Sequence, residues 1–365
     1  MDVYLKVSSD PAVTDVKRKL FTGKALKILQ EQKSDSLNKE RLFEVANNYF
    51  SLRDWEAFKK ASNSALEKSI KDRDTLNIAK AFRYRAEYYR NIENTDSAFY
   101  YYLKAEKLYK KVDDKISLGK IYLKKGVLQF YRNDYFGADN SISQAYNLLK
   151  NSDDKETVYK AVSMTGIIAN EMEDYPRALD KHEEALKLVK QYNLNGPQNQ
   201  EATTLNNIGN VYQNLDKNQE AITNFKLALQ NKNLLNETPD LYAILVDNLA
   251  YSKFKLRDYS QLPALFFKAL KIRDSLNMSS GVVQSEIHLS EYFAAVGDTV
   301  NSQKYAYNAI FRAKTSKTPV DVMASLKQLS LVDHKNASKH TREYIKLNDS
   351  LQQAERLSKN NLNRI

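Results

Sequence analysis

The sequence of 365 residues contains no cysteine, and it has only nine glycines and six prolines. Without cysteine the chain has no disulfide, no thiolate metal ligand and no cysteine nucleophile, although this leaves its compartment open. So few glycines and prolines argue against the many tight turns of an all-β protein, and helix is favoured. No apolar run approaches the roughly 18 residues of a membrane-spanning helix. The first residues lack the apolar core of a secretory signal, so we expect either a cytoplasmic protein or one whose signal has been removed.

Motifs typical of catalysis or of metal binding are also missing. The glycines form neither GxGxxG nor a Walker loop, so no phosphate-binding loop is expected. Adjacent carboxylates fall on expected solvent faces, with no strand-end loop to bring them together. We therefore predict no enzymatic activity, no cofactor and no metal ion. The histidines lack the spacing of metal ligands; they are His182, His288, His334 and His340.

The net charge of +11 is spread along the chain rather than concentrated. Lysines alternate with acids, as in residues 110–115, and no basic run has the five to eight residues of a nucleic-acid patch. Solvated helix faces are the preferred interpretation, because dispersed charge keeps a helical protein soluble. A functional basic surface is the alternative, and we expect no nucleic-acid binding within this chain.

Small residues return at a fixed interval along most of the chain. Alanines recur with gaps of 40, 40, 40, 43, 41 and 40 residues, and a second small residue precedes each alanine by 19 positions. Such a period is typical of a solenoid, in which stacked repeats complete one another's core. We expect two helices per repeat, the small residue of the first packing against the alanine of the second. The alanines are Ala65, Ala105, Ala145, Ala185, Ala228, Ala269 and Ala309, and the small residues are Ala46, Ala86, Gly126, Gly166, Gly209, Ala250 and Ser290.

The clearest repeat covers about residues 202–232. Its apolar and small residues follow spacings that place each set on one face of a helix. The polar segment 214–218 between the two sets predicts a tight turn between antiparallel helices. This pattern resembles the tetratricopeptide repeat. The matching residues are Leu205, Ile208, Gly209, Tyr212, Ala221, Phe225 and Ala228.

The resemblance implies an all-α fold, a right-handed superhelical solenoid of antiparallel helix pairs with a period of about 40 residues. About seven repeats are recognisable between residues 37 and 315. We expect an N-terminal helical cap over residues 1–36, the repeat array over 37–343 and a C-terminal connector helix over 344–365. In this frame His182 takes the position of the repeat's aromatic residue, and we expect it to be packed in the core.

The period exceeds the family's usual 34 residues, so the helices are expected to be longer by about a turn in total. Acidic and hydroxyl residues recur before the expected first helices, where they cap helix N-termini. These segments are 34–36, 72–75, 113–114, 152–154 and 274–275.

The resemblance also implies that first helices line an inner, concave surface. Asn206, Asn210 and Gln213 lie on one stripe of such a helix, with Asn207 beside them. Amides both donate to and accept from a peptide backbone, so this ladder predicts a site for a partner protein or an extended peptide. A merely polar, solvated groove is the alternative. Neighbouring repeats would add Arg83, Arg90, Phe130, Lys160, Asn170, Asp247 and Tyr251.

A chaperone adaptor is disfavoured. The family's clamp for chaperone tails needs a lysine followed four residues later by asparagine on a first helix. Here Arg83 is followed by Glu87, and Lys160 by Met164.

The segment from Tyr344 to Leu351 resembles the exit helix of bacterial tetratricopeptide sensors, whose repeats connect through a membrane helix to a histidine kinase or a helix-turn-helix regulator. This implies a sensor region of a membrane-anchored signalling protein, on the periplasmic side, with a membrane helix and an output domain beyond Ile365. The alternative is a soluble cytoplasmic scaffold or a peptide-responsive regulator. A nucleic-acid-binding helical repeat is a third hypothesis, which a steep salt dependence of binding would reveal.

Overall fold

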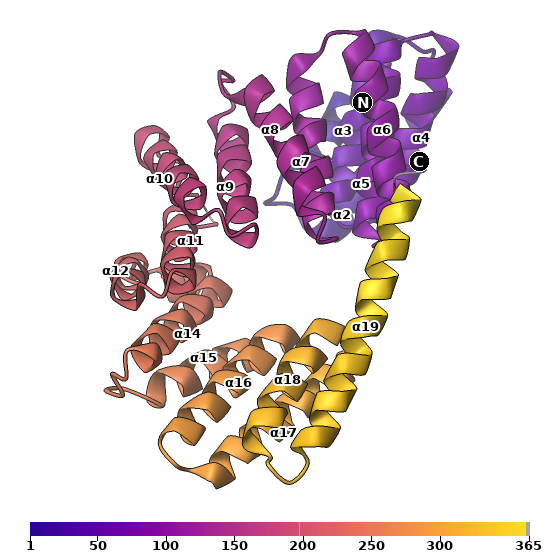
Figure 1. The fold of residues 1–365 in the computed structure, drawn as a ribbon. Coiled ribbons are helices and arrows are strands. Elements are labelled where there is room, and N and C mark those ends of the chain that lie inside the picture. The colour runs from indigo at the N-terminus through magenta and orange to yellow at the C-terminus, as the bar shows by residue number, and fades with distance from the viewer. Residues whose placement is uncertain (197, 363–365) are drawn as a thin grey trace. The chain divides into compact units, whose positions relative to one another are not determined.

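The computed structural model describes residues 1–196 and 198–362, and the side chains of residues 1–196 and 198–353. Every regular element in these residues is a helix, so the all-α prediction is confirmed (Figure 1). The chain forms two compact units, the N-terminal unit Met1–Ala161 and the C-terminal unit from Val162 onward. No helix of the described residues is both long enough and apolar enough to cross a membrane.

Seven consecutive helix pairs correspond to the seven expected repeats. The turn predicted at residues 214–218 joins two helices that end at Asn214 and begin at Asn218. The first helices are α3 (Ser36–Ser51), α5 (Thr75–Asn91), α7 (Lys115–Phe130), α9 (Lys155–Glu171), α11 (Gln200–Asn214), α14 (Pro239–Lys255) and α16 (Ser279–Ala295). The second helices are α4 (Trp55–Lys71), α6 (Thr95–Lys111), α8 (Tyr135–Leu149), α10 (Tyr175–Tyr192), α12 (Asn218–Ala228), α15 (Ala264–Ser275) and α17 (Thr299–Thr315). A short helix, α13 (Leu234–Glu237), precedes α14.

Local signals set the helix ends in the early repeats. Asp35, for example, accepts a hydrogen bond at 2.7 Å from the backbone N–H of Asn38, which satisfies one of the free donors in the first turn of α3. At the other end of α3, Arg53 adopts φ 53° and its N–H donates to the Phe50 carbonyl, which closes the last turn. Similar left-handed residues follow at 73, 93, 113 and 133, so each helix and its turn occupy 20 residues. Two such elements make the period of 40.

One of the expected capping segments, residues 274–275, does not cap a first helix. Asp274 and Ser275 end α15 instead of preceding a first helix, and α16 begins after Met278 without a side-chain cap. The Asp274 carboxylate instead accepts from Arg312 of α17 at 2.9 Å. The prediction that these residues cap a helix is therefore wrong.

The recurring alanines are core residues, each no more than 2% exposed. The three glycines among the small residues of the first helices, however, lie closest to a large side chain rather than to the predicted alanine. A Cβ added at Gly209 would lie 2.3 Å from the Phe225 ring, and one at Gly126 would lie 2.6 Å from Ile142. The partner is thus the large residue 16 positions later, not the alanine 19 positions later, because a gap beside a glycine admits a large side chain from the opposite helix.

His182 fills the same kind of gap. Its ring is 1% exposed and lies against Gly166, where an added Cβ would approach to 2.6 Å. Burial lowers the pKa of His182 to about 4, so the ring is neutral at physiological pH. The prediction of a packed core histidine is confirmed.

The segments outside the seven pairs are helical as well. At the N-terminus, α1 (Asp2–Ser9) and α2 (Asp15–Glu31) contribute Leu5, Leu26 and Leu29 to the core that α3 and α4 form. At the C-terminus, α18 (Pro319–Val332) is followed by α19 (Ala337–Leu362). The helix that includes the expected connector thus begins already at Ala337, and residues 363–365 lie outside the described residues.

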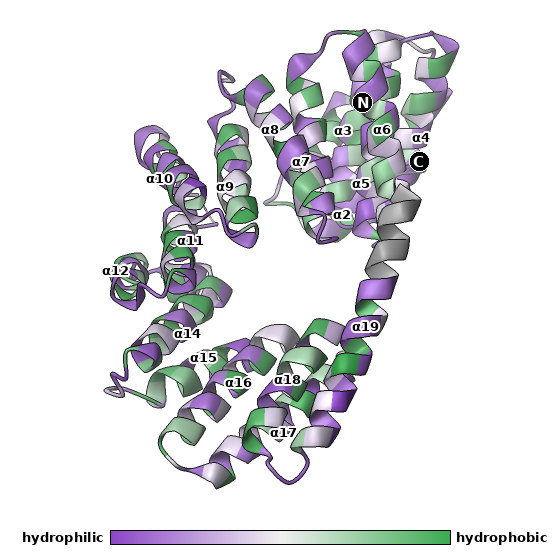
Figure 2. Cartoon of the chain, in the orientation of Figure 1, coloured by the Kyte–Doolittle hydropathy of each residue, from purple (hydrophilic) through white to green (hydrophobic). Residues whose placement is uncertain are grey.

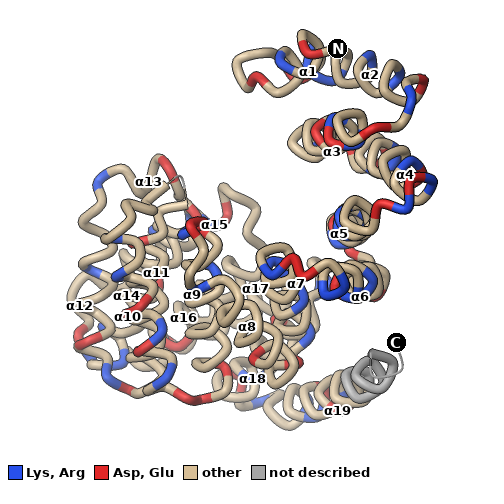
Figure 3. The backbone as a smooth tube through the Cα atoms, turned by 90° about the horizontal axis from the view of Figure 1, so that it is seen from above, with Lys and Arg blue, Asp and Glu red and all other residues tan. Residues whose placement is uncertain are grey.

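Hydrophobic and hydrophilic residues alternate along the helices (Figure 2), and lysines and arginines are interspersed with acids in each unit (Figure 3). Large buried residues, among them Phe43, Phe58 and Tyr102 in the N-terminal unit and Phe225 and Phe266 in the C-terminal unit, fill the space between helices. Each unit therefore has its own apolar core, as a solenoid of stacked pairs requires.

Candidate functional site

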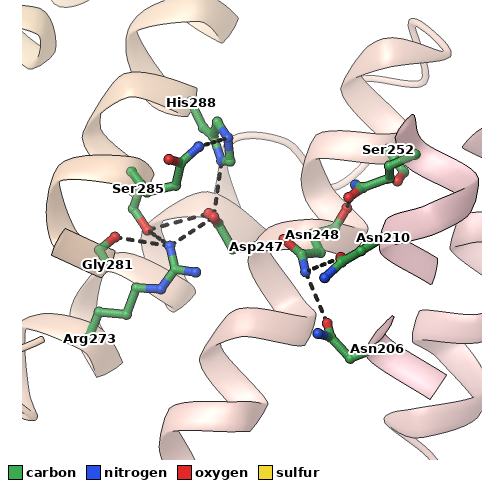
Figure 4. A network of polar contacts seen from close by, with 11 residues as sticks. Asn206, Asn210, Asp247, Asn248, Ser252, Arg273, Gly281, Ser285 and His288 are labelled. Carbon is green, nitrogen blue, oxygen red and sulfur yellow. Dashed lines mark hydrogen bonds and ion pairs between the residues drawn. The ribbon is translucent and has the colours of Figure 1, made fainter. Parts of the chain in front are cut away.

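The predicted amide ladder of α11 meets a further amide from α14. Asn248 donates from its Nδ2 to the Oδ1 atoms of both Asn206 and Asn210, each at 3.0 Å (Figure 4). Gln213 donates in turn to the backbone carbonyl of Asn248 at 3.0 Å and to Ser252 Oγ at 2.8 Å. The structure therefore brings the three predicted residues together, but uses part of their hydrogen-bonding capacity to join two repeats.

The same contacts leave a defined set of groups free. Among the side chains of residues 1–196 and 198–353, neither the Nδ2 amino groups of Asn206 and Asn210 nor the Oδ1 of Asn248 has a further hydrogen-bond partner, and none of these atoms is sealed from solvent. Two donors and one acceptor thus remain on adjacent side chains. They can pair with two carbonyl oxygens and one N–H group of an extended peptide backbone.

Asp247, also predicted to face a ligand, is instead fully buried. Arg273 of α15 donates to its carboxylate at 2.8 Å, Ser285 of α16 donates at 3.3 Å, and His288 Nδ1 lies 3.0 Å away (Figure 4). Burial acts to raise the pKa of Asp247, but His288 and Arg273 outweigh it and hold the pKa below its ordinary value. This carboxylate therefore ties three helices together beneath the amide face.

Tyr251 connects that buried cluster with the surface. Its half-buried ring stacks on His288 at 4.3 Å between centroids. Burial, together with the nearby Glu291 carboxylate, raises the pKa of Tyr251 to about 12, so its hydroxyl remains a hydrogen-bond donor over the physiological range.

Asn170 and Asn207 lie near the ladder. Asn214 donates to Asn170 Oδ1 at 3.0 Å, which links α11 to α9 within the C-terminal unit. The Nδ2 of Asn207 is buried with no partner among the described residues. Such a group is costly to leave unsatisfied.

The remaining predicted residues belong to the N-terminal unit. Lys160 is exposed and pairs with Glu156 at 2.6 Å, and Phe130 packs edge-on against Tyr131 at 5.7 Å. Arg90 pairs with the buried Glu87 at 2.9 Å. Arg83 lies over the ring of Tyr84 at 4.7 Å. These residues form separate local contacts, and none of these contacts joins them to the amide ladder.

Sequence reasoning missed Asn248, Arg273, Ser285 and His288. The expected site included Asn207, two positions before Gly209, but not Asn248, which lies two positions before Ala250. Its equivalent in the preceding repeat is Asn207, so a recurring asparagine at that position was a usable signal. No group of three or more histidine, aspartate or glutamate side chains in the described part of the chain is arranged to hold a metal ion.

Comparison with known proteins identifies the repeat. Residues 158–233 match the family described as tetratricopeptide repeat. No curated protein sequence matches the chain.

Solved structures resemble the whole fold. The apo quorum sensor NprR from B. thuringiensis superposes with a TM-score of 0.68 at 14% identity, covering 95% of this chain and 97% of that one. A Rap protein complexed with competence and sporulation factor gives 0.62 at 14%, covering 96% of each chain. Aspartyl phosphate phosphatase F from Bacillus subtilis gives 0.61 at 17%, covering 96% and 92%. At these identities the likeness concerns the fold.

Proposed function

Because the chain is a tetratricopeptide-repeat protein, we propose that its C-terminal unit binds an extended peptide, or an unstructured segment of a partner protein, along α11 and α14. In this proposal the protein is a peptide-responsive regulator. A similar structure, the Rap conjugation gene regulator of the plasmid pLS20, was solved in complex with the Phr* peptide and superposes with a TM-score of 0.58 at 14% identity, which supports a peptide ligand.

The observation that carries the proposal is the arrangement of Asn206, Asn210 and Asn248. Two free amino groups and one free carbonyl lie on neighbouring side chains whose orientations are fixed by their mutual hydrogen bonds. Fixed amides lose little rotational freedom when a ligand arrives, so they favour binding more than the same groups on mobile side chains would.

The amides set the direction of the ligand rather than its affinity. A hydrogen bond exchanged with water contributes a net of about 1 kcal/mol. Three such bonds give about 3 kcal/mol, which is weaker than millimolar binding. The remaining affinity must come from ligand side chains, so the preferred sequence depends on surfaces beside the ladder.

Selection from a display library of random short peptides tests this function. We expect selected peptides to lose binding when the peptide bond that faces the ladder is N-methylated, because methylation removes a backbone donor while keeping every side chain. Peptides that tolerate N-methylation at every bond would contradict backbone recognition by the amides.

A sensor region of a membrane-anchored protein is the second candidate, and α19 favours it. Tyr344 packs against the core of α17 and α18, whereas the next residue, Ile345, is 51% exposed. The proposal expects the turns after Ser350 to bury little apolar area, as a connector would. Ending the chain at Ser350 should leave the melting temperature almost unchanged, and a fall of about ten degrees or more would identify the segment as a structural cap and remove this candidate.

We further infer that the protein acts by binding rather than by catalysis. One similar structure is named a phosphatase of aspartyl phosphate, so acyl-phosphate hydrolysis is the activity to exclude. The purified chain should leave the hydrolysis rate of acetyl phosphate unchanged, and an acceleration that depends on protein concentration would contradict the inference.

A further inference from the structure

The last of the seven helix pairs buries a carboxylate at a position where the other pairs have no charge. Glu286 of α16 is 2% exposed and lies four positions before the small residue Ser290. Burying a carboxylate costs free energy unless its charge is compensated, so Glu286 is an exception among the repeats. The equivalent residues of the six other first helices are all apolar or aromatic: Leu42, Phe82, Tyr122, Val162, Leu205 and Val246.

Arg312 of α17 compensates this charge only in part. Its Nε donates to Glu286 Oε1 at 3.1 Å, but the other carboxylate oxygen, Oε2, is buried and has no hydrogen-bond partner among the described residues. The same guanidinium donates to Asp274 of α15 at 2.9 Å, so one positive charge serves two carboxylates. Val283 and Ala309, which lie three residues before the two members of the pair, are buried in an apolar cluster. The pair thus lies at the edge of an apolar contact between α16 and α17.

These surroundings favour the protonated form of Glu286. Burial raises the pKa of Glu286 to about 7, although Arg312 acts to lower it, and the charge of Asp274 adds to the rise. Burial and the nearby Glu286 charge also raise the pKa of Tyr305 of α17, so this hydroxyl lies near the carboxylate. Among the described residues, α14 and α18, which also pack against α16, add no charged group that shifts the pKa of Glu286. The carboxyl group therefore exchanges its proton close to neutral pH.

Arg312 lies where it can move away from Glu286. Its side chain is 43% exposed and forms part of the wall of a cavity of about 530 Å³. A released Arg312 would be solvated there and would keep Asp274 as its charged partner. The other residues that line the cavity offer hydroxyl and amide groups and one aromatic ring: Ser279, Asn308, Phe311, Thr315 and Ser316.

We propose that Glu286 and Arg312 form a proton-controlled latch between α16 and α17. When Glu286 is ionised, the ion pair holds the two helices together at this position. When the carboxylate takes up a proton from solvent, its charge is lost and Arg312 turns into the cavity. The packing of the last helix pair then responds to pH near neutrality. The latch does not depend on the proposed peptide site.

NMR of the full chain detects the latch through the Nε–Hε signal of Arg312 between pH 5 and 8. We expect one transition near pH 7 in the unmodified chain and none in Glu286→Gln, which keeps the shape of the side chain but cannot ionise. Asp274→Asn should keep the transition but move its midpoint to lower pH, because a charge that favours protonation is lost. A transition that persists in Glu286→Gln, or its absence from the unmodified chain, would overturn the proposal.

Stability gives an independent readout. The native state binds the proton of Glu286 more tightly than the unfolded chain does, where glutamate has its ordinary pKa of 4.5. This group therefore contributes stability that is present at low pH and lost as the pH rises through about 7. The unfolding equilibrium constant of the unmodified chain, divided by that of Glu286→Gln, should rise by about tenfold or more between pH 5 and 8.

Other titrating groups, among them His182, cancel in this ratio because both chains contain them. Glu67→Gln is the matched control, since it removes the same charge from an exposed position of α4, and its ratio should stay constant over this range. A ratio for Glu286→Gln as constant as that of the control would contradict the latch.

Discussion

The helices α3 to α10 and the helices α11 to α16 follow the same repeat but are fixed by different interactions. Every helix from α3 to α10 has an aspartate or asparagine whose side chain accepts a backbone N–H of its first turn, at distances between 2.7 and 3.3 Å. None of the helices from α11 to α16 is capped by the side chain of its N-cap residue, and in α11 only the more distant Asn195 accepts a first-turn N–H, that of Glu201 at 3.3 Å. Polar side chains bond from one repeat to the next in both regions, as from Lys39 to Asp74 at 2.7 Å in the early one, but the fully buried carboxylate Asp247 lies in the later one.

The difference lies in how the helix ends are set. Where caps are present, each helix boundary is encoded within a few residues of the chain. Where they are missing, Asn248 and Asp247 supply specific bonds between helices that lie far apart in sequence. The proposed peptide site lies in this second region, where polar groups are already fixed for use at a surface.

The largest expected effect comes from removing the buried carboxylate of the later region. Asp247→Ala leaves the guanidinium of Arg273, which is 4% exposed, without its charged partner. Removing one member of a buried pair costs about 3–5 kcal/mol. Denaturant titration should show this loss, whereas Lys111→Ala on the surface of α6 should stay within about 0.5 kcal/mol. A cost for Asp247→Ala as small as that of Lys111→Ala would refute the role of this cluster.

Close packing gives the next effect. Gly209→Leu forces side-chain atoms into the space of the buried Phe225 ring, and we expect a loss of about 3 kcal/mol. Gly23→Ala in the middle of α2 is the control, because its new Cβ would lie 3.5 Å from Tyr49 Oη, an ordinary contact. That variant should be neutral or slightly stabilising through helix propensity. If Gly209→Leu lowered the free energy of unfolding no more than Gly23→Ala does, Gly209 would have no packing role.

His182 should make stability depend on pH. The native ring stays neutral down to about pH 4, whereas in the unfolded chain the histidine has its ordinary pKa of about 6.5. The unfolded state therefore holds more protons between these values, and stability falls as the pH drops, by up to about 3 kcal/mol. His182→Phe places the aromatic found in the equivalent position of the next repeat and should flatten this slope. An unchanged slope between about pH 7 and 5 would assign the dependence to other groups.

Changes to helix caps should have the smallest effect on stability, and they test the difference between the early and the later helices directly. Asp114→Ala removes the 2.9 Å bond to the Ser117 N–H and should cost about 1 kcal/mol. Met278 precedes α16 with φ −82° and ψ 73°, close to the −81° and 84° of Asp114, so Met278→Asp should add the missing cap and gain a similar amount. Loss of stability in Met278→Asp would show that the later helices are not simply uncapped copies of the early ones.

Much of this fold is predictable because the repeat makes its main contacts locally. Alanine spacing located all seven pairs, and a polar turn located the end of α11 at Asn214. Periodicity also placed Asn206, Asn210 and Gln213 on one stripe. It did not reveal that Asn248 binds two of them, or that Asp247 points inward to Arg273 and His288. Such contacts depend on how one repeat stacks on the next, and the spacing within a helix carries no information about that register.

The central claim is that the free amides of α11 and α14 hold a peptide. Isothermal titration calorimetry tests this claim most directly. It compares the affinity of a peptide selected from the random library for the unmodified chain and for two variants. Asn210→Ala should weaken binding by about 1–3 kcal/mol, because the loss of one amide leaves a ligand group unpaired. Lys226→Ala on the exposed side of α12 should leave the affinity unchanged. Equal affinities for both variants and the unmodified chain would place the peptide elsewhere and contradict the account.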